Sequence, residues 1–182
     1  MNIAESALDP EERLALVKWY VDQNRLDSAL IEIKPLLVDE TSNEVLITAA
    51  RLYAQLRLFA RAEALFSRYL EIDPGSINAR FQLGMSRFDN GDLSAAIDTW
   101  QQILATDPHN PPALFYSALA RLQNGDAGES GAMLNTILQH TATNNLYHGK
   151  ARDLLDQLEQ NSESRDGEAV TKAANSPYST EH

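Results

Sequence analysis

Apolar and polar residues alternate along this chain with the period of amphipathic helices. The clearest stretch runs from Asn78 to Asn110, NARFQLGMSRFDNGDLSAAIDTWQQILATDPHN. It predicts two helices of about a dozen residues each, joined by a tight turn at Gly91-Asp92 and ended by Asp107-Pro108. Small residues lie inside both helices, Gly84 in the first and Ala96 in the second. A large side chain at either position would push the helices apart, so the stretch predicts a closely packed helical hairpin.

The same pattern recurs at intervals of 34 residues. A further unit precedes these repeats, with a spacing that is one residue shorter. The residues that match the small, turn and helix-ending positions are Ala29, Ala50, Ala62, Asp73-Pro74, Ala118 and Gly125-Asp126. We therefore expect an N-terminal extension at residues 1–8 and four hairpins, at residues 9–42, 43–76, 77–110 and 111–144.

The first and last hairpins depart from the regular pattern. The first opens with a capping box of Asp9 and Glu12 around Pro10, but its second helix contains Pro35. Proline removes a backbone hydrogen bond, so this helix is expected to kink or to shift its register. The last hairpin has Gly128 and Ser130-Gly131 in its second helix. Glycine lowers helix propensity, so this helix is expected to be the least stable of the array.

The chain after the hairpins changes character. Residues 145–160, NLYHGKARDLLDQLEQ, carry apolar side chains at helical spacing. They predict a capping helix that covers the open apolar end of the array. Residues 161–182 contain little that could be buried, which predicts a disordered tail.

This 34-residue helix–turn–helix pattern resembles the tetratricopeptide repeat family over about Asp9 to Asn144. The resemblance implies an all-α fold, a right-handed α-α superhelix of about four helical hairpins plus a C-terminal capping helix. In this family the first helix of each hairpin lines the concave face.

The resemblance also implies which side chains face a groove. Its N-terminal half is polar and its C-terminal half is aromatic and aliphatic, as in adaptable apolar binding surfaces. The cations would orient an acidic end of a partner, and the apolar residues would bury its apolar side chains. The expected groove consists of Lys18, Thr48, Arg51, Phe81, Gln82, Met85, Phe88, Phe115, Tyr116, Leu119 and Leu122. Alternatively, the capping helix or the tail covers the groove, or the groove joins copies of the chain.

One specific function within the family is excluded by residue type. Repeats that hold the acidic C-termini of heat-shock chaperones use a set of Lys, Asn and Arg side chains as a clamp for two carboxylates. The matching positions hold Leu14, Lys18, Thr48, Asn78 and Gln82. Only Lys18 is a cation, so the clamp is not present as a set.

Charge and cysteine content narrow the kinds of partner. The formal net charge is −11 and the pI is near 4.7. A field of this sign repels nucleic acid and anionic membranes, so neither is an expected partner. Cysteine is absent, which excludes disulfides and thiol chemistry. Residues 1–14 contain Glu5 and lack the basic and apolar regions of a signal peptide, so we expect a cytoplasmic protein without membrane insertion. A periplasmic location is the alternative if a signal or anchor has been removed.

Catalytic chemistry is not indicated. His109, His140, His148 and His182 do not have metal-ligand spacing and are expected at the surface. Ser130 lies in GESGA, which is not a nucleophile elbow. We therefore expect no enzyme activity, no cofactor and no metal. Arg87 and Arg121 occupy a position where Tyr20 and Tyr53 stand in the earlier units, and are expected either to pack between helices or to contact a ligand.

The expected function is a non-catalytic adaptor, assembly factor or chaperone that binds a protein or peptide. Three alternatives differ in class. The first is a homo-oligomeric scaffold. The second is an envelope assembly factor, because repeats followed by a helix also resemble the tetratricopeptide portions of cytochrome c maturation proteins. The third is a secretion-type chaperone that keeps an unstable subunit soluble.

Overall fold

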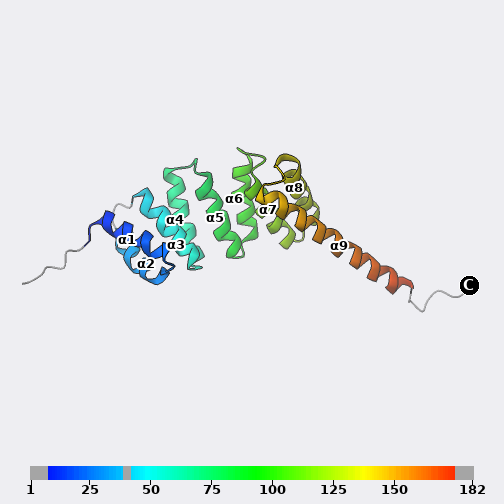
Figure 1. Ribbon diagram of the computed structural model, residues 1–182, viewed down its shortest axis with the longest axis horizontal. Helices are drawn as coiled ribbons and strands as arrows, with labels where there is room; N and C mark the ends of the chain where they lie inside the picture. The colour runs from blue at the N-terminus through cyan, green and yellow to red at the C-terminus, as the bar shows by residue number, and fades with distance from the viewer. Residues whose placement is uncertain (1–7, 39–41, 175–182) are drawn as a thin grey trace, which may run out of the picture. The chain divides into compact units, whose positions relative to one another are not determined.

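The structure is a computed structural model that describes residues 8–38 and 42–174. Every regular element within these residues is a helix (Figure 1). The elements are α1 (Pro10–Asp22), α2 (Leu26–Ile33), the 3₁₀ helix η1 (Lys34–Leu37), α3 (Asn43–Gln55), α4 (Phe59–Ile72), α5 (Ile77–Asp89), α6 (Leu93–Leu104), α7 (Pro111–Gln123), α8 (Ala127–His140) and α9 (Leu146–Ala174).

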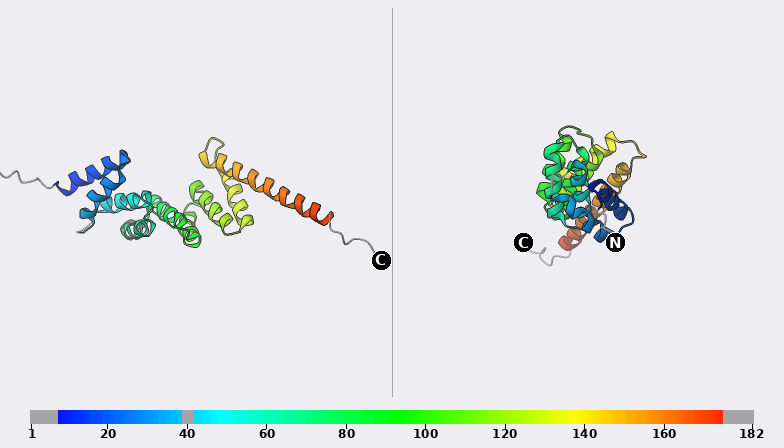
Figure 2. Two further views of the ribbon diagram at one scale, coloured as in Figure 1. Left: turned by 90° about the horizontal axis from the view of Figure 1, so that it is seen from below. Right: turned by 90° about the vertical axis from the view of Figure 1, so that its left-hand side faces the viewer.

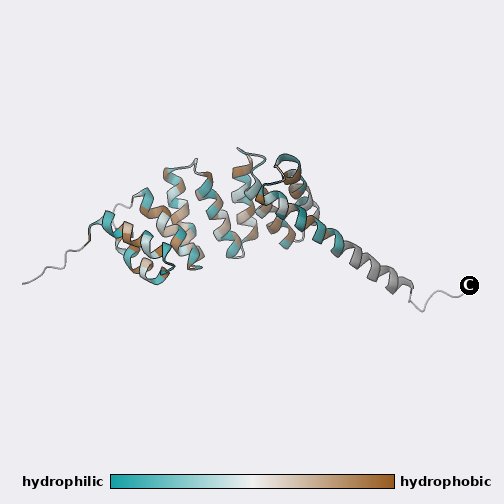
Figure 3. Cartoon of the chain, viewed as in Figure 1, coloured by the Kyte–Doolittle hydropathy of each residue, from teal (hydrophilic) through white to brown (hydrophobic). Residues whose placement is uncertain are grey.

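The chain divides into two compact units, Met1–Pro108 with α1 to α6 and His109–His182 with α7 to α9. In the first unit α1 packs on α2, α3 on α4 and α5 on α6, while α3 also contacts α1 and α5. In the second unit α7 packs on α8, and α9 packs on both. Figure 3 shows apolar residues on every hairpin helix, interleaved with hydrophilic ones. Each hairpin falls within one of the four predicted segments.

The first helix of every hairpin begins at a side-chain cap. The caps accept hydrogen bonds from backbone N–H groups three residues later: Asp9 from Glu12 at 2.8 Å, Ser42 from Val45 at 3.3 Å, Ser76 from Ala79 at 3.4 Å and Asn110 from Ala113 at 3.1 Å. The Glu12 carboxylate also accepts the Asp9 N–H, which completes the predicted capping box. These caps fix where the expected groove helices start.

Each hairpin turn contains one residue in the left-handed region. These are Asn24 (φ 55°), Arg57 (φ 58°), Gly91 (φ 86°) and Gly125 (φ 94°). Glycine adopts this conformation without strain, whereas a residue with a Cβ does not. The glycine turns were predicted from the sequence; Arg57 shows that the same geometry forms without glycine.

The small residues of the repeat are buried, as expected for positions where two helices pack closely. The alanines at these positions are fully buried in both units. In the last hairpin Ser130 takes the position and is also fully buried. The fully buried members of this set are Ala29, Ala50, Ala62, Ala96, Ala118 and Ser130.

Pro35 has the predicted effect on the first hairpin. Helix α2 ends at Ile33, and the chain continues as the 3₁₀ helix Lys34–Leu37 with Pro35 in its first turn. Proline cannot donate the backbone bond that another α-helical turn requires, so the tighter 3₁₀ form takes over.

Helix α9 is longer than the sequence suggested. It continues to Ala174, whereas the capping helix was expected to end at Gln160 and a disordered tail to follow (Figure 2). The small number of large apolar residues after Gln160 predicts little burial, but it does not argue against helix formation. Once a helix is nucleated by a docked segment, each further residue adds one backbone bond at little cost. The rest of the expected tail, residues 175–182, lies outside the described residues, as do residues 1–7 of the N-terminal extension.

Candidate functional site

The polar residues of the expected groove lie on the first helices of the first unit. Lys18 on α1 is exposed, and its ammonium group forms an ion pair with Glu44 on α3. Thr48 on α3 is half-buried, and Arg51 on the same helix is exposed. Since Lys18 already has a carboxylate partner, its charge is less available to orient an acidic ligand than the sequence suggested.

The aromatic residues of α5 contact the tryptophan of α6. The ring centroids of Phe81 and Phe88 lie 6.1 Å and 5.9 Å from that of Trp100. Both phenylalanines are half-buried, as are Gln82 and Met85. Part of this surface therefore packs inside the hairpin.

Arg87 and Arg121 make contacts within their own units. The Arg87 guanidinium donates to Thr99 Oγ1 at 2.6 Å and lies 3.4 Å from a Glu63 carboxylate oxygen. Arg121 pairs with Glu129. Both arginines are half-buried. Of the two alternatives for this position, the structure favours packing between helices over ligand contact.

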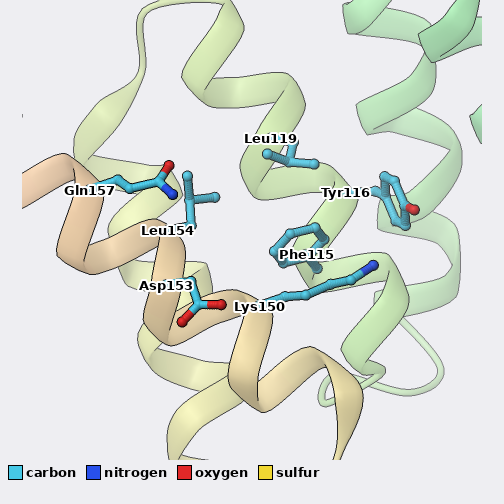
Figure 4. Close-up of a pocket in the computed structure, with 7 residues that line it drawn as sticks. All are labelled: Phe115, Tyr116, Leu119, Lys150, Asp153, Leu154 and Gln157. Atoms are coloured by element: carbon cyan, nitrogen blue, oxygen red, sulfur yellow. The ribbon is translucent and has the colours of Figure 1, made fainter.

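The remaining expected residues lie on α7, and there the second unit forms an open groove. Its volume is about 410 Å³, within the range of about 300–1,000 Å³ typical of ligand pockets. Phe115, Tyr116 and Leu119 project into it from α7 (Figure 4). The facing wall comes from α9. Its lining residues are Lys150, Asp153, Leu154 and Gln157. Leu122, the fourth expected residue of α7, is half-buried and does not line this groove.

An aromatic cluster forms one end of the groove. The Phe115 ring lies 5.6 Å from Tyr116 and 5.7 Å from Tyr147 of α9, centroid to centroid. Only 8% of Phe115 is exposed, so this side chain mainly holds α9 against α7. The Lys150 ammonium lies over the rings of Phe115 and Tyr147, at 5.6 Å and 5.4 Å from their centroids. Burial, and secondarily the nearby Tyr116, raise the pKa of the Tyr147 phenol above its ordinary value of 10.0.

One alternative predicted from the sequence was that the capping helix covers the groove, and the contact between α7 and α9 tests it. Phe115 is largely buried by this contact, while Tyr116 and Leu119 stay half-buried and line the open groove. Helix α9 therefore narrows the expected site on α7 and supplies its second wall.

His148 was expected at the surface, and that prediction is wrong. It is buried at the start of α9, with 6% of its surface exposed. Its Nδ1 lies 3.2 Å from the Thr141 carbonyl oxygen, and its Nε2 lies 2.9 Å from a nitrogen of the Arg152 guanidinium. A guanidinium can only donate, so Nε2 accepts and the ring proton lies on Nδ1. The histidine thereby joins the end of α8 to the start of α9.

Two further histidines contact each other. The rings of His109 and His140 stack with centroids 3.8 Å apart, although both residues are exposed. They lie too far apart in the sequence for helical spacing to reveal the pair. Within residues 8–38 and 42–174 no group of three or more His, Asp or Glu side chains is arranged to hold a metal ion.

Sequence reasoning missed the α9 wall. Lys150, Asp153 and Gln157 follow one another at intervals of three and four residues, beside the predicted apolar position Leu154. This spacing places them on one face of a helix. The groove positions were carried over from the hairpins alone, so the capping helix was not considered as a wall. Among the described helices none is long and apolar enough to span a membrane.

Comparison with known proteins agrees with the repeat pattern. The tetratricopeptide repeat family model matches residues 87–158, which include the second-unit hairpin and the docked part of α9. Residues 87–158 therefore belong to the tetratricopeptide repeat family. No curated protein matches the sequence of this chain.

Solved structures with the same fold include several named MamA. The MamA structure of AMB-1 has a TM-score of 0.66 and 22% identity, covering 75% of each chain. That of MSR-1 has a TM-score of 0.68 and 22% identity, covering 74% of this chain and 78% of the other. MamA from Desulfovibrio magneticus RS-1, residues 41 to the end, has a TM-score of 0.67 and 15% identity, covering 93% of this chain and all of the other. At these identities the likeness concerns the fold, and it confirms the predicted all-α class of tetratricopeptide-type superhelix.

A tetratricopeptide repeat fold supports a general kind of function. Its helical hairpins present extended surfaces on which proteins bind. The family match and the fold therefore support a protein–protein interaction module.

Proposed function

We propose that this protein is a non-catalytic module that binds a short segment of another protein in the groove between α7 and α9. The observation that carries the proposal is the composition of this groove. The α7 wall is aromatic and aliphatic, and the α9 wall carries an ammonium, a carboxylate and an amide. Apolar surface supplies the binding energy, and a few placed polar groups fix the orientation of the ligand.

The geometry supports a segment rather than a large flat interface. The groove has a volume of about 410 Å³ and is bounded by two helices of one unit. Standard interfaces between folded proteins bury about 800 Å² on each partner, which takes about 20–30 residues on each side. This groove is lined by seven residues. An amphipathic helix or an extended peptide, by contrast, can place a few side chains between two helices.

The expected residues of the first unit form a second surface in this proposal. Phe81, Met85 and Phe88 are half-buried on α5, and Arg51 on α3 makes no hydrogen bond or ion pair with any described residue. An adaptor, an assembly factor and a chaperone would all act through such binding.

The proposal is tested by capture of partners from lysate on the immobilised protein, with mass spectrometry. Leu119→Lys places a charge in the apolar wall of the groove. Asn135→Lys adds the same charge at an exposed position of α8 and serves as the matched control. We expect the Leu119 variant to lose at least one partner that the wild type and the control retain, with helical content unchanged.

Identical partner lists for the three proteins would contradict the proposal. Capture of further copies of the same chain alone, lost in the Leu119 variant, would instead identify the groove as a self-association site. It would favour a homo-oligomeric scaffold over an adaptor.

A further inference from the structure

Lys150 is the cation of the groove, and within the described residues no carboxylate forms an ion pair with it. The four ion pairs among the described residues join Arg13 with Glu32, Lys18 with Glu44, Arg87 with Glu63 and Arg121 with Glu129. Lys150 takes part in none of them. Its recorded contacts are with the aromatic rings of Phe115 and Tyr147.

Asp153 lies one helical turn further along the same wall. It is exposed and, within the described residues, forms no ion pair with Lys150. The ammonium group points toward the α7 side of the groove, while the carboxylate stays on the α9 side (Figure 4). The two opposite charges are therefore presented separately to a ligand.

The surroundings of Lys150 strengthen an ion pair between its ammonium group and an anionic ligand. The residue is half-buried, and two aromatic rings replace part of the water around its ammonium group. An ion pair formed in such a site is stronger than one at an open surface, because the surrounding medium screens it less. The molecule as a whole carries a net charge of −11, which on average repels a carboxylate, so a local cation such as Lys150 favours one position for it.

The groove also separates apolar and polar contacts. All the lining residues of α7 are apolar or aromatic, and the charged or amide side chains Lys150, Asp153 and Gln157 all come from α9. A ligand must place its apolar side chain against α7 and its polar groups against α9. Next to Lys150 it needs an anion, and next to Asp153 it must avoid one.

We propose that the groove selects partner segments in which a large apolar residue is flanked by a carboxylate, with the carboxylate paired to Lys150. This inference rests on the proposed function and adds the chemistry of the partner. The Lys150 pair determines the register and preference of the segment, and the α7 wall supplies most of the affinity.

The test uses a displayed library of random twelve-residue peptides, selected on the full-length chain. Selections run in parallel on the wild type, Lys150→Gln, Lys150→Glu and Lys34→Glu. Lys34 is an exposed lysine of the other unit, so its replacement by glutamate changes the net charge as Lys150→Glu does.

We expect wild-type binders to be enriched in Asp or Glu beside an apolar residue. Lys150→Gln should remove the acidic enrichment, and Lys150→Glu should replace it with enrichment in Lys or Arg. Lys34→Glu should select the same peptides as the wild type. For a single acidic peptide, Lys150→Gln should weaken binding about fivefold, as loss of an ion pair worth about 1 kcal/mol predicts.

Equal acidic content in the wild-type and Lys150→Gln selections would overturn this inference. So would an equal effect of Lys34→Glu, because it would show that only net charge matters. If such peptides nevertheless fail to bind Leu119→Lys, the proposed function stands and only the carboxylate preference is wrong. If no peptides are enriched, or if they bind Leu119→Lys as well as the wild type, both proposals fail.

Discussion

The indole ring of Trp100 lies directly against the Cα of Gly84. A Cβ at Gly84 would lie 2.2 Å from Nε1 and 2.6 Å from Cε2 of that ring. Trp100 is fully buried, and its Nε1–H donates to the Phe81 carbonyl oxygen at 3.3 Å. The ring therefore cannot move aside easily. This contact holds α5 against α6 and positions the two phenylalanines that were expected to line the groove.

Gly84→Ala should destabilise the protein because the added methyl overlaps a fixed ring. Overpacking of this kind typically costs about 1–3 kcal/mol. Chemical denaturation followed by circular dichroism measures the loss. Gly131→Ala is the matched control, since a Cβ there meets nothing within 4 Å and the residue lies within α8. It should stabilise α8 by about 0.5–1 kcal/mol through helix propensity. Equal effects of the two substitutions would contradict the close contact.

Two substitutions at left-handed turn residues should have opposite effects on stability. Arg57→Gly should stabilise the second hairpin by about 0.5–1 kcal/mol, because it removes the strain of a positive φ and this outweighs the added chain entropy. Gly91→Ala should destabilise the third hairpin by a similar amount, although a Cβ there meets nothing within 4 Å. Thermal unfolding of both variants tests the prediction. A stabilising Gly91→Ala would show that the turn does not require its left-handed residue.

His148→Ala should loosen α9 from the hairpin of the second unit. The substitution removes a buried ring that hydrogen-bonds Thr141 and accepts from Arg152. The loss of such a buried bond costs about 1–3 kcal/mol. Hydrogen exchange should speed up in the first turns of α9 while α5 and α6 stay protected. His140→Ala, at an exposed position, is the control. Unchanged exchange in α9 would mean that His148 does not hold the helix.

The raised pKa of the Tyr147 phenol predicts that the folded protein loses stability in alkaline solution. Its folded pKa is raised above the ordinary 10.0, so the folded state holds the proton more tightly than the unfolded state. This stabilising effect is complete below pH 10 and is lost as the pH rises through the folded pKa. Urea unfolding at pH 8 and above pH 10 should show a smaller pH-dependent loss in Tyr147→Phe than in the wild type. Equal losses in both proteins would contradict burial of the phenol.

The repeat pattern predicted most of the fold because it depends on local signals. Caps such as Asp9, turn residues such as Gly91 and small residues such as Ala96 act within one hairpin and can be read from spacing. The end of α9 was not predictable in the same way. Residues 161–182 contain few large apolar side chains, which predicts little burial but does not determine where the backbone stops being helical.

The candidate site was predicted only in part, for a related reason. Phe115, Tyr116 and Leu119 were found because their positions on α7 follow the repeat. Lys150 was not, since it belongs to the capping helix, whose packing direction no repeat position fixes. The contact of Lys18 with Glu44 was missed as well, because it joins two hairpins and depends on how they stack.

A photo-crosslinking amino acid placed at Leu119 tests the central claim most directly. Irradiation in lysate, followed by mass spectrometry, identifies what lies in the groove between α7 and α9. The proposed function predicts a cross-link to a defined segment of another protein, absent when the same group replaces Asn135 on α8. Cross-links of equal yield from both positions, or none from Leu119, would contradict a binding site in this groove.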